Sequence, residues 1–189
     1  PGLQRFALRC TVLSAALARA SGNHLRAGAF FADFAEATPV PLVSALLQEQ
    51  ASLCLLFMEP PRFRRMAFRL VFAARKFVAS RQHTHALRCY RYAQSVYAGH
   101  EWKLIDDHIG FNLGRQLSSN DRGPEAFSLF QSLLCDAVAS RERQASYLRE
   151  MLYLATSTEP EARSRLKLDI LTLPLIARDS VRILVGASK

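Results

Sequence analysis

The apolar residues of this chain recur three to four positions apart, which is the period of an α-helix. The clearest case begins at Arg62 and ends at Ser80. At about 100° per residue, its apolar side chains fall within an arc of roughly 140°. They are Phe63, Met66, Ala67, Leu70, Val71, Ala74, Phe77 and Val78, and the basic Arg62, Arg65, Arg69 and Lys76 lie opposite. The pattern predicts an amphipathic helix.

Glycine and proline interrupt this periodicity and divide the chain into eight predicted helices. Gly22 and Asn23 tolerate left-handed backbone geometry and mark the first turn. Pro39 stops the second helix, and Pro60 with Pro61 stops the third, because proline lacks an amide donor and clashes with the preceding turn. The predicted helices are Leu3 to Ala20, His24 to Ala37, Pro41 to Phe57, Arg62 to Ser80, His83 to Tyr97, Trp102 to Leu117, Pro124 to Ala139 and Glu142 to Ala155.

Three stretches share one spacing, in which a small residue is followed twelve positions later by alanine and four positions after that by an aromatic residue. The sets are Ala15, Ala27 and Phe31; Ala74, Ala86 and Tyr90; and Gly114, Ala126 and Phe130. This spacing is typical of the tetratricopeptide repeat, a hairpin of two antiparallel helices. Because one hairpin cannot bury its apolar face alone, we expect an all-α, tetratricopeptide-like solenoid of antiparallel helix pairs with a right-handed curve.

The pattern changes after residue 157. Residues 158–179 are interrupted by two prolines and predict a linker. Residues 180–186 alternate and are rich in β-branched side chains, which predicts a short strand. We therefore expect a helical solenoid at 1–157, a linker at 158–179 and, at 180–189, the start of a truncated β domain.

The composition indicates a folded piece of a longer intracellular protein. Half of the 189 residues are apolar, and the first residue is Pro1 rather than methionine. Neither a signal peptide nor an uncharged apolar run of about 18 residues is present. Four cysteines, Cys10, Cys54, Cys89 and Cys135, are 35 to 46 positions apart. We expect free, buried thiols in a reducing compartment rather than disulfides.

The net positive charge is concentrated in one window. Between Pro60 and His100 there are nine Lys and Arg residues and no Asp or Glu, and the other 16 basic residues equal the 16 acidic ones in number. We expect six of the nine to form a basic interaction patch on two adjacent helices: Arg62, Arg65, Arg69, Lys76, Arg88 and Arg91. Such a patch attracts an anionic membrane or an acidic partner. The alternative is a solvated face that only keeps the repeat soluble.

No residue is predicted to carry out catalysis or to hold a cofactor. Neither glycine-rich phosphate-binding motif occurs. His83, His85 and Cys89 are fewer than the roughly four ligands that a structural zinc ion needs. The run Asp106 to His108 cannot converge on one point, because consecutive helical residues diverge by about 100°. We expect no enzyme activity, no cofactor and no metal.

Several segments, taken in order, resemble one family. The longest is His85-Ala-Leu-Arg-Cys-Tyr-Arg-Tyr-Ala-Gln-Ser-Val-Tyr97, which continues through Trp102-Lys-Leu-Ile-Asp-Asp-His-Ile-Gly-Phe-Asn-Leu-Gly-Arg-Gln116. The others include Leu8-Arg-Cys-Thr-Val-Leu-Ser-Ala, Leu46-Leu-Gln-Glu-Gln-Ala-Ser-Leu-Cys-Leu and Tyr147-Leu-Arg-Glu-Met-Leu-Tyr153. Together they resemble the α-solenoid of the trafficking protein particle complex (TRAPP) subunit eight family, over nearly the whole chain. Members of that family are much longer.

The resemblance implies a non-catalytic scaffold segment of a TRAPP III-type vesicle-tethering complex. That complex is an exchange factor for a Rab1-type GTPase in endoplasmic-reticulum-to-Golgi transport and autophagy. The implied partners are other TRAPP subunits and, through the complex, the GTPase. The implied location is cytoplasmic, peripheral to Golgi and pre-autophagosomal membranes. No catalytic residue is carried over, because exchange belongs to the small core subunits of the complex.

Two other functions compete with this one. A basic helical-repeat protein binds RNA when aromatic and basic residues alternate for base stacking. Here the aromatic residues of the acid-free window lie mostly in apolar arcs, so we expect no nucleic acid partner. A generic tetratricopeptide adaptor captures peptides with basic residues on several helices, whereas here the basic residues are concentrated in one predicted hairpin.

Overall fold

The computed structural model describes residues 2–100, 102–135 and 140–157, and within these residues all regular structure is helical. The helices are α1 (Gly2–Ala20), α2 (His24–Ala37), α3 (Pro41–Leu56), α4 (Phe63–Ala79), α5 (His83–Tyr97), α6 (Lys103–Ser118), α7 (Gly123–Cys135) and α8 (Arg141–Ser157). The all-helical class is therefore confirmed for this part of the chain. The predicted linker and strand, and the predicted end of the seventh helix at Ala139, lie outside the described residues.

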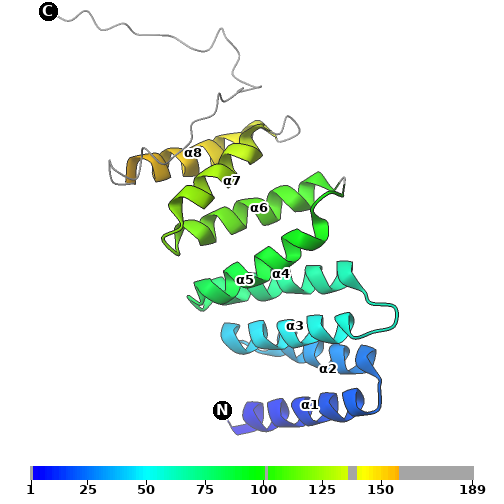
Figure 1. Cartoon of the computed structure of the whole chain (residues 1–189). Coiled ribbons are helices and arrows are strands. Elements are labelled where there is room, and N and C mark those ends of the chain that lie inside the picture. Colours follow the sequence, from blue (N-terminus) through cyan, green and yellow to red (C-terminus); the bar gives the residue numbers. More distant parts are fainter. Residues whose placement is uncertain (1, 101, 136–139, 158–189) are drawn as a thin grey trace, which may run out of the picture.

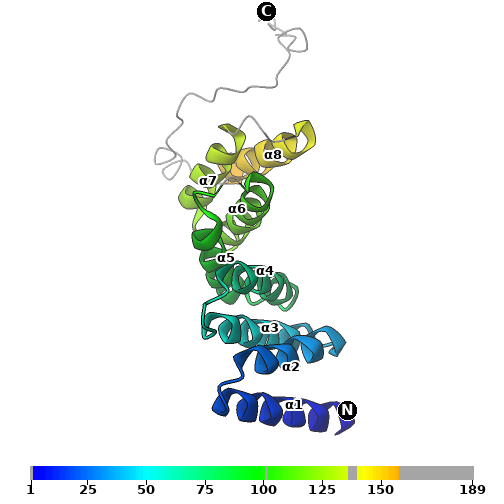
Figure 2. The same ribbon diagram turned by 90° about the vertical axis from the view of Figure 1, so that its right-hand side faces the viewer.

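The eight helices stack in the order of the sequence, with α1 at one end and α8 at the other (Figure 1). Each helix packs chiefly against the helix before it and the helix after it. A view turned by 90° shows the same succession (Figure 2). The stack therefore depends on contacts between neighbours rather than on one central core, as repeat proteins do.

Local chemistry positions the first turns. Gly22 has φ 76°, a left-handed backbone conformation that favours glycine. Asn23 then caps α2, since its side-chain oxygen accepts a hydrogen bond from the Arg26 backbone amide at 3.0 Å. Pro41 begins α3, where the missing amide donor would have had no helical partner. These turns let three helices follow one another closely.

The nine residues of the repeated spacing are all buried. Ala27, Ala86 and Ala126 have no exposed surface. The closest approach is at the third set, where a Cβ atom on Gly114 would lie 2.6 Å from Cζ of Phe130. Since that distance is too short for two carbon atoms, α6 and α7 can approach in this way only with glycine at position 114.

The buried apolar residues form two clusters that meet at α3. One cluster joins α1, α2 and α3 and includes Phe31 and Cys54. The other begins at Ala45 of α3 and continues through α8, and its largest fully buried side chains include Phe77 and Tyr90. Helix α3 therefore contributes to both clusters, and it is the element that connects the two parts of the stack.

The outer side of α1 is apolar but exposed. Leu3, Phe6, Leu13 and Leu17 are spaced so that they share one face of the helix, and each exposes 65% or more of its surface. Among the described residues, no helix is both long enough and apolar enough to pass through a membrane.

The four cysteines differ in their surroundings. All four thiols are free; Cys54 and Cys89 are buried, whereas Cys10 and Cys135 are exposed. The expectation of buried thiols is therefore wrong for Cys10 and Cys135. Burial, with a smaller effect from the Glu49 carboxylate, raises the pKa of the Cys89 thiol to about 12.

The Gly114 contact gives a first prediction. Alanine favours a helix over glycine by about 1 kcal/mol, but overpacking a filled site costs about 1–3 kcal/mol. We expect Gly114→Ala to lower the midpoint of thermal unfolding by several degrees. Gly110→Ala is the control in the same helix, because its Cβ would meet only the end of the Leu133 side chain, at 3.2 Å. A Gly114→Ala variant that melts with or above Gly110→Ala would contradict this packing.

The thiols give a second prediction. At about pH 8, near the ordinary thiol pKa of about 8.5, exposed cysteines react readily and buried ones stay protonated. We expect two of the four thiols to react quickly with Ellman's reagent in the native chain and all four to react in denaturant. Fast reaction of four thiols without denaturant would show that Cys54 and Cys89 are accessible.

Candidate interaction groove on helices α2, α3 and α4

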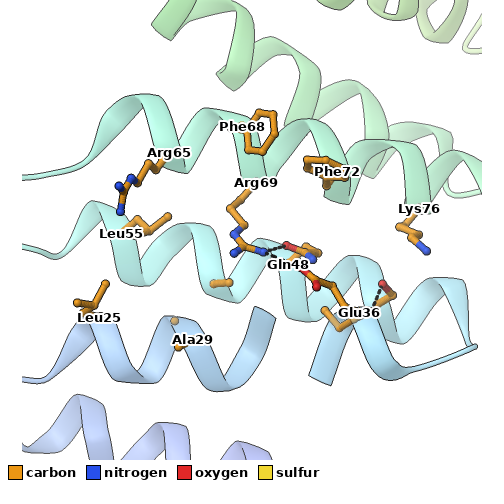
Figure 3. A pocket seen from close by; sticks show the side chains of 14 residues that line it. Leu25, Ala29, Glu36, Gln48, Leu55, Arg65, Phe68, Arg69, Phe72 and Lys76 are labelled. Carbon is orange, nitrogen blue, oxygen red and sulfur yellow. Dashed lines mark hydrogen bonds and ion pairs between the residues drawn. The ribbon is translucent and has the colours of Figure 1, made fainter. Parts of the chain in front are cut away.

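A groove of about 680 Å³ lies between α2, α3 and α4. Figure 3 shows the 14 side chains that line it, with α3 between the residues of α2 and those of α4. We call this feature the α2–α4 groove. It is formed by three successive helices, and α3 supplies its floor.

The floor consists of small or buried side chains. Ser44 and Ala51 of α3 are 1% exposed, and the Ser44 hydroxyl donates a hydrogen bond to the Ala35 carbonyl at 2.7 Å. Gly28 of α2 faces α3 so closely that a Cβ atom there would lie 3.3 Å from Cβ of Cys54. Because these side chains are short, the floor leaves space between α2 and α4. The Ser44 hydroxyl already has a hydrogen-bond partner.

One side of α4 forms the rim. Arg65, Phe68, Arg69, Phe72 and Lys76 follow one another at helical spacing and line the groove. Phe68 is 56% exposed and Phe72 is 39% exposed, and their ring centroids are 4.9 Å apart in an edge-to-face arrangement. The stack itself does not cover these rings, so they leave an apolar surface open to a partner.

Arg69 in the middle of the rim belongs to the framework. Its guanidinium donates a hydrogen bond to Oε1 of the buried Gln48 at 3.1 Å and lies 3.6 Å from the Glu36 carboxylate (Figure 3). Arg69 thereby joins α4 to α3 and to α2. The side chains of Arg65 and Lys76 are exposed and have neither hydrogen bond nor ion pair within the described part of the chain.

The six residues of the predicted basic patch are divided among three hollows. Arg65, Arg69 and Lys76 line the α2–α4 groove. Arg62, with Arg65 again, lines a hollow at the start of α4. Arg88 and Arg91 line a third hollow, along α5. Both are already in ion pairs: Arg88 lies 2.5 Å from the Glu49 carboxylate and Arg91 lies 3.1 Å from the Glu125 carboxylate. Sequence reasoning missed these acidic partners because all three, Glu36, Glu49 and Glu125, lie outside the acid-free window.

These ion pairs connect helices that are two apart in the stack. They are Arg69–Glu36, Arg88–Glu49, Arg91–Glu125 and Arg115–Glu150. Each pair is partly exposed, and such pairs contribute at most about 1 kcal/mol. The apolar contacts between neighbouring helices therefore contribute most of the stability of the stack, and these ion pairs add little.

His83 and His85, which were considered as metal ligands, each contact a different part of the stack. The His83 ring nitrogen Nδ1 lies 2.9 Å from Oε1 of Gln116, and the His85 ring packs 5.3 Å from that of Phe77. Among the described residues, no group of three or more His, Cys, Asp or Glu side chains is arranged to hold a metal ion. The α2–α4 groove is thus the feature that the structure adds to the sequence reasoning. Its one signal in the sequence was that Phe68 and Phe72 lie off the apolar arc of α4.

The two arginines of the rim give a third prediction. Arg69→Ala leaves the buried Gln48 oxygen without its donor, which costs about 1–3 kcal/mol. Arg65→Ala, one turn earlier on the same helix, removes no partner and changes the free energy of unfolding by less than about 0.5 kcal/mol. Urea unfolding of both variants measures the difference. Equal stability of the two would mean that Arg69 does not join the helices.

Comparison with known proteins finds a relative of this chain. No family model matches it. Over 185 residues it is 35% identical to trafficking protein particle complex subunit 8 of Homo sapiens, a match that covers 96% of this chain and 12% of that protein. The chain thus spans about an eighth of that relative's length. The resemblance seen in the sequence is confirmed: the chain is a relative of trafficking protein particle complex subunit 8, matched along one segment of that protein.

Proposed function

We propose that this chain is a non-catalytic scaffold segment of a trafficking protein particle complex and acts by binding other proteins. The similarity to subunit 8 over nearly the whole chain is the observation that carries the proposal. The arrangement of neighbour-packed helices supports it, because stacked helical repeats present extended surfaces for protein contact. We assign the fold, within the same proposal, to the tetratricopeptide-like solenoids.

The described residues offer no obvious chemistry beyond binding. Burial raises the pKa of Cys89 and of Tyr90 to about 12, so neither side chain is an activated nucleophile or base at neutral pH. Both lie in the apolar core of α5 rather than in a cleft. Their raised pKa values follow from burial in the packed core rather than from a site that activates them.

The finer part of the proposal concerns the complex. We place the chain in a TRAPP III-type complex that tethers vesicles and exchanges nucleotide on a Rab1-type GTPase, in endoplasmic-reticulum-to-Golgi transport and autophagy. The chain contacts other subunits on the cytoplasmic side of Golgi and pre-autophagosomal membranes and reaches the GTPase only through them. Within the described residues, Arg62, Arg65 and Lys76 of the predicted basic patch have no ion pair and keep their charge available for a partner, whereas Arg88 and Arg91 are paired.

This proposal predicts an absence of intrinsic exchange activity together with a requirement for assembly. The purified chain should leave the rate of nucleotide release from a Rab1-type GTPase unchanged. The longer protein that contains it should co-purify with small TRAPP subunits, and deleting residues 2–157 should weaken that association. Clear acceleration of nucleotide release by the chain alone, or co-purification with RNA in place of subunits, would overturn the scaffold function.

A further inference from the structure

The α2–α4 groove combines two features that the stack does not need for its own stability. Phe68 and Phe72 are exposed on the rim, and Arg65 and Lys76 are cations without a hydrogen bond or ion pair to any residue that the structure describes. We propose that this groove receives one amphipathic, acidic helix of a partner protein. The proposal rests on the protein-binding role proposed above and names the kind of segment that is bound.

Apolar contact supplies the centre of the proposed interface. Phe68 and Phe72 lie on the α4 side of the groove, and Leu25, which is 51% exposed, lies on the α2 side (Figure 3). Aromatic side chains that pass from water into a packed interface are frequent hot spots of binding. A helix placed between these walls would bury all three side chains at once.

The basic side chains at the two ends of the groove indicate where the partner carries acidic residues. Arg65 and Lys76 lie toward opposite ends of the groove (Figure 3). They are 11 positions apart on α4, which corresponds to about 16 Å, or three helical turns. Among the described residues that line the groove, Glu36 is the only acidic one, and Arg69 is close to it. The structure therefore favours carboxylates about three turns apart on the partner, with apolar residues between them.

The structure of the groove favours a helix over an extended peptide as the bound segment. The described part of the chain has no strand edge to which an extended peptide could add. Phe68 and Phe72 are four positions apart, so they form a ridge of the kind that packs into the grooves of another helix. The short side chains of Ala29 and Ala51 leave room for close approach of such a helix.

A protein partner fits the groove better than a lipid surface. A basic residue near an anionic membrane contributes about 1 kcal/mol. Among the described residues that line the groove, only Arg65 and Lys76 are cations without a described partner. The Glu36 carboxylate, whose side chain is 72% exposed, lies on the same surface and would be repelled by anionic lipid. A helix avoids this repulsion by placing an apolar or hydrogen-bond-donating residue opposite Glu36.

Selection from a displayed library of helical peptides, about 16 residues or four to five turns long, tests the proposal on the 189-residue chain. We expect the enriched peptides to carry an apolar stripe with Asp or Glu toward both ends. Fluorescence anisotropy of the best peptide should show that Phe68→Ser with Phe72→Ser weakens binding at least about tenfold. Tyr92→Ser is the matched control and should bind like the parent, because Tyr92 lies on α5 outside the groove and is exposed to a similar extent as Phe68.

Charge reversal provides a variant that spares the aromatic residues. Arg65→Glu with Lys76→Glu should weaken the same peptide, and a peptide with Lys in place of its end carboxylates should recover binding to this variant. Both variants alter exposed side chains, and thermal melting verifies that they fold. Enriched peptides without acidic residues, or binding unchanged by both variants, would overturn the proposal. So would a chain that enriches no peptide but binds phosphatidylserine vesicles through Phe68 and Phe72.

The outcome separates this inference from the scaffold function. If the longer protein still co-purifies with TRAPP subunits while the groove variants bind every selected peptide like the parent, the scaffold function stands and the groove inference fails. If the groove binds acidic helices but no TRAPP subunit co-purifies, the groove inference stands and the complex assignment fails.

Discussion

The close approach of consecutive helices at small residues is the constraint on which the rest of the structure depends. At Gly114 the neighbouring helix comes so near that no Cβ atom fits beside Phe130. Ala27, Ala86 and Ala126 are buried with no exposed surface. Larger side chains at these positions would separate the helices and open voids, and the dispersion contacts that hold close-packed interiors would be lost.

This constraint explains why the binding feature lies where it does. Two of the hairpins defined by the repeated spacing, α1–α2 and α4–α5, are separated by α3, which has no place in the repeat. Helix α3 packs on both sides, and its polar Ser44 and Gln48 are buried with hydrogen bonds to Ala35 and Arg69. The inserted helix lets α2 and α4 face each other across a floor of short side chains. The groove is therefore a consequence of an irregularity in the repeat rather than of the repeat itself.

Periodicity predicted the helices well, because the spacing of apolar residues and the positions of Gly22, Pro41 and Pro60 are local signals. The small and aromatic positions were also readable, since one hairpin places them close together along the chain. The ion-pair partners of the basic residues could not be predicted from the sequence. Arg88 meets Glu49 and Arg91 meets Glu125 across an intervening helix, and a charge window says nothing about such distant pairs.

Exposure at the ends of the stack was equally hidden from the sequence. The spacing of Leu3, Phe6 and Leu13 is that of a covered helix face, yet they are exposed. Likewise, Cys10 lies among apolar residues but is not buried. The helical period of apolar residues shows that one face of a helix is apolar. It does not show whether another helix covers that face. Phe68 and Phe72 lie off the apolar arc of α4 in the sequence, but only the structure shows that they border a groove formed with α2 and α3.

The account as a whole requires that each helix be stabilised chiefly by its neighbours. Hydrogen exchange on a chain that ends after Asp121, and therefore lacks α7 and α8, measures this most directly. In a stack held by neighbour contacts, the amides of α2, α3 and α4 keep the slow exchange that they show in the 189-residue chain, while α6 loses protection. If the amides of α2 to α4 exchange as fast as those of an unfolded peptide, the helices form one cooperative core and the account is wrong.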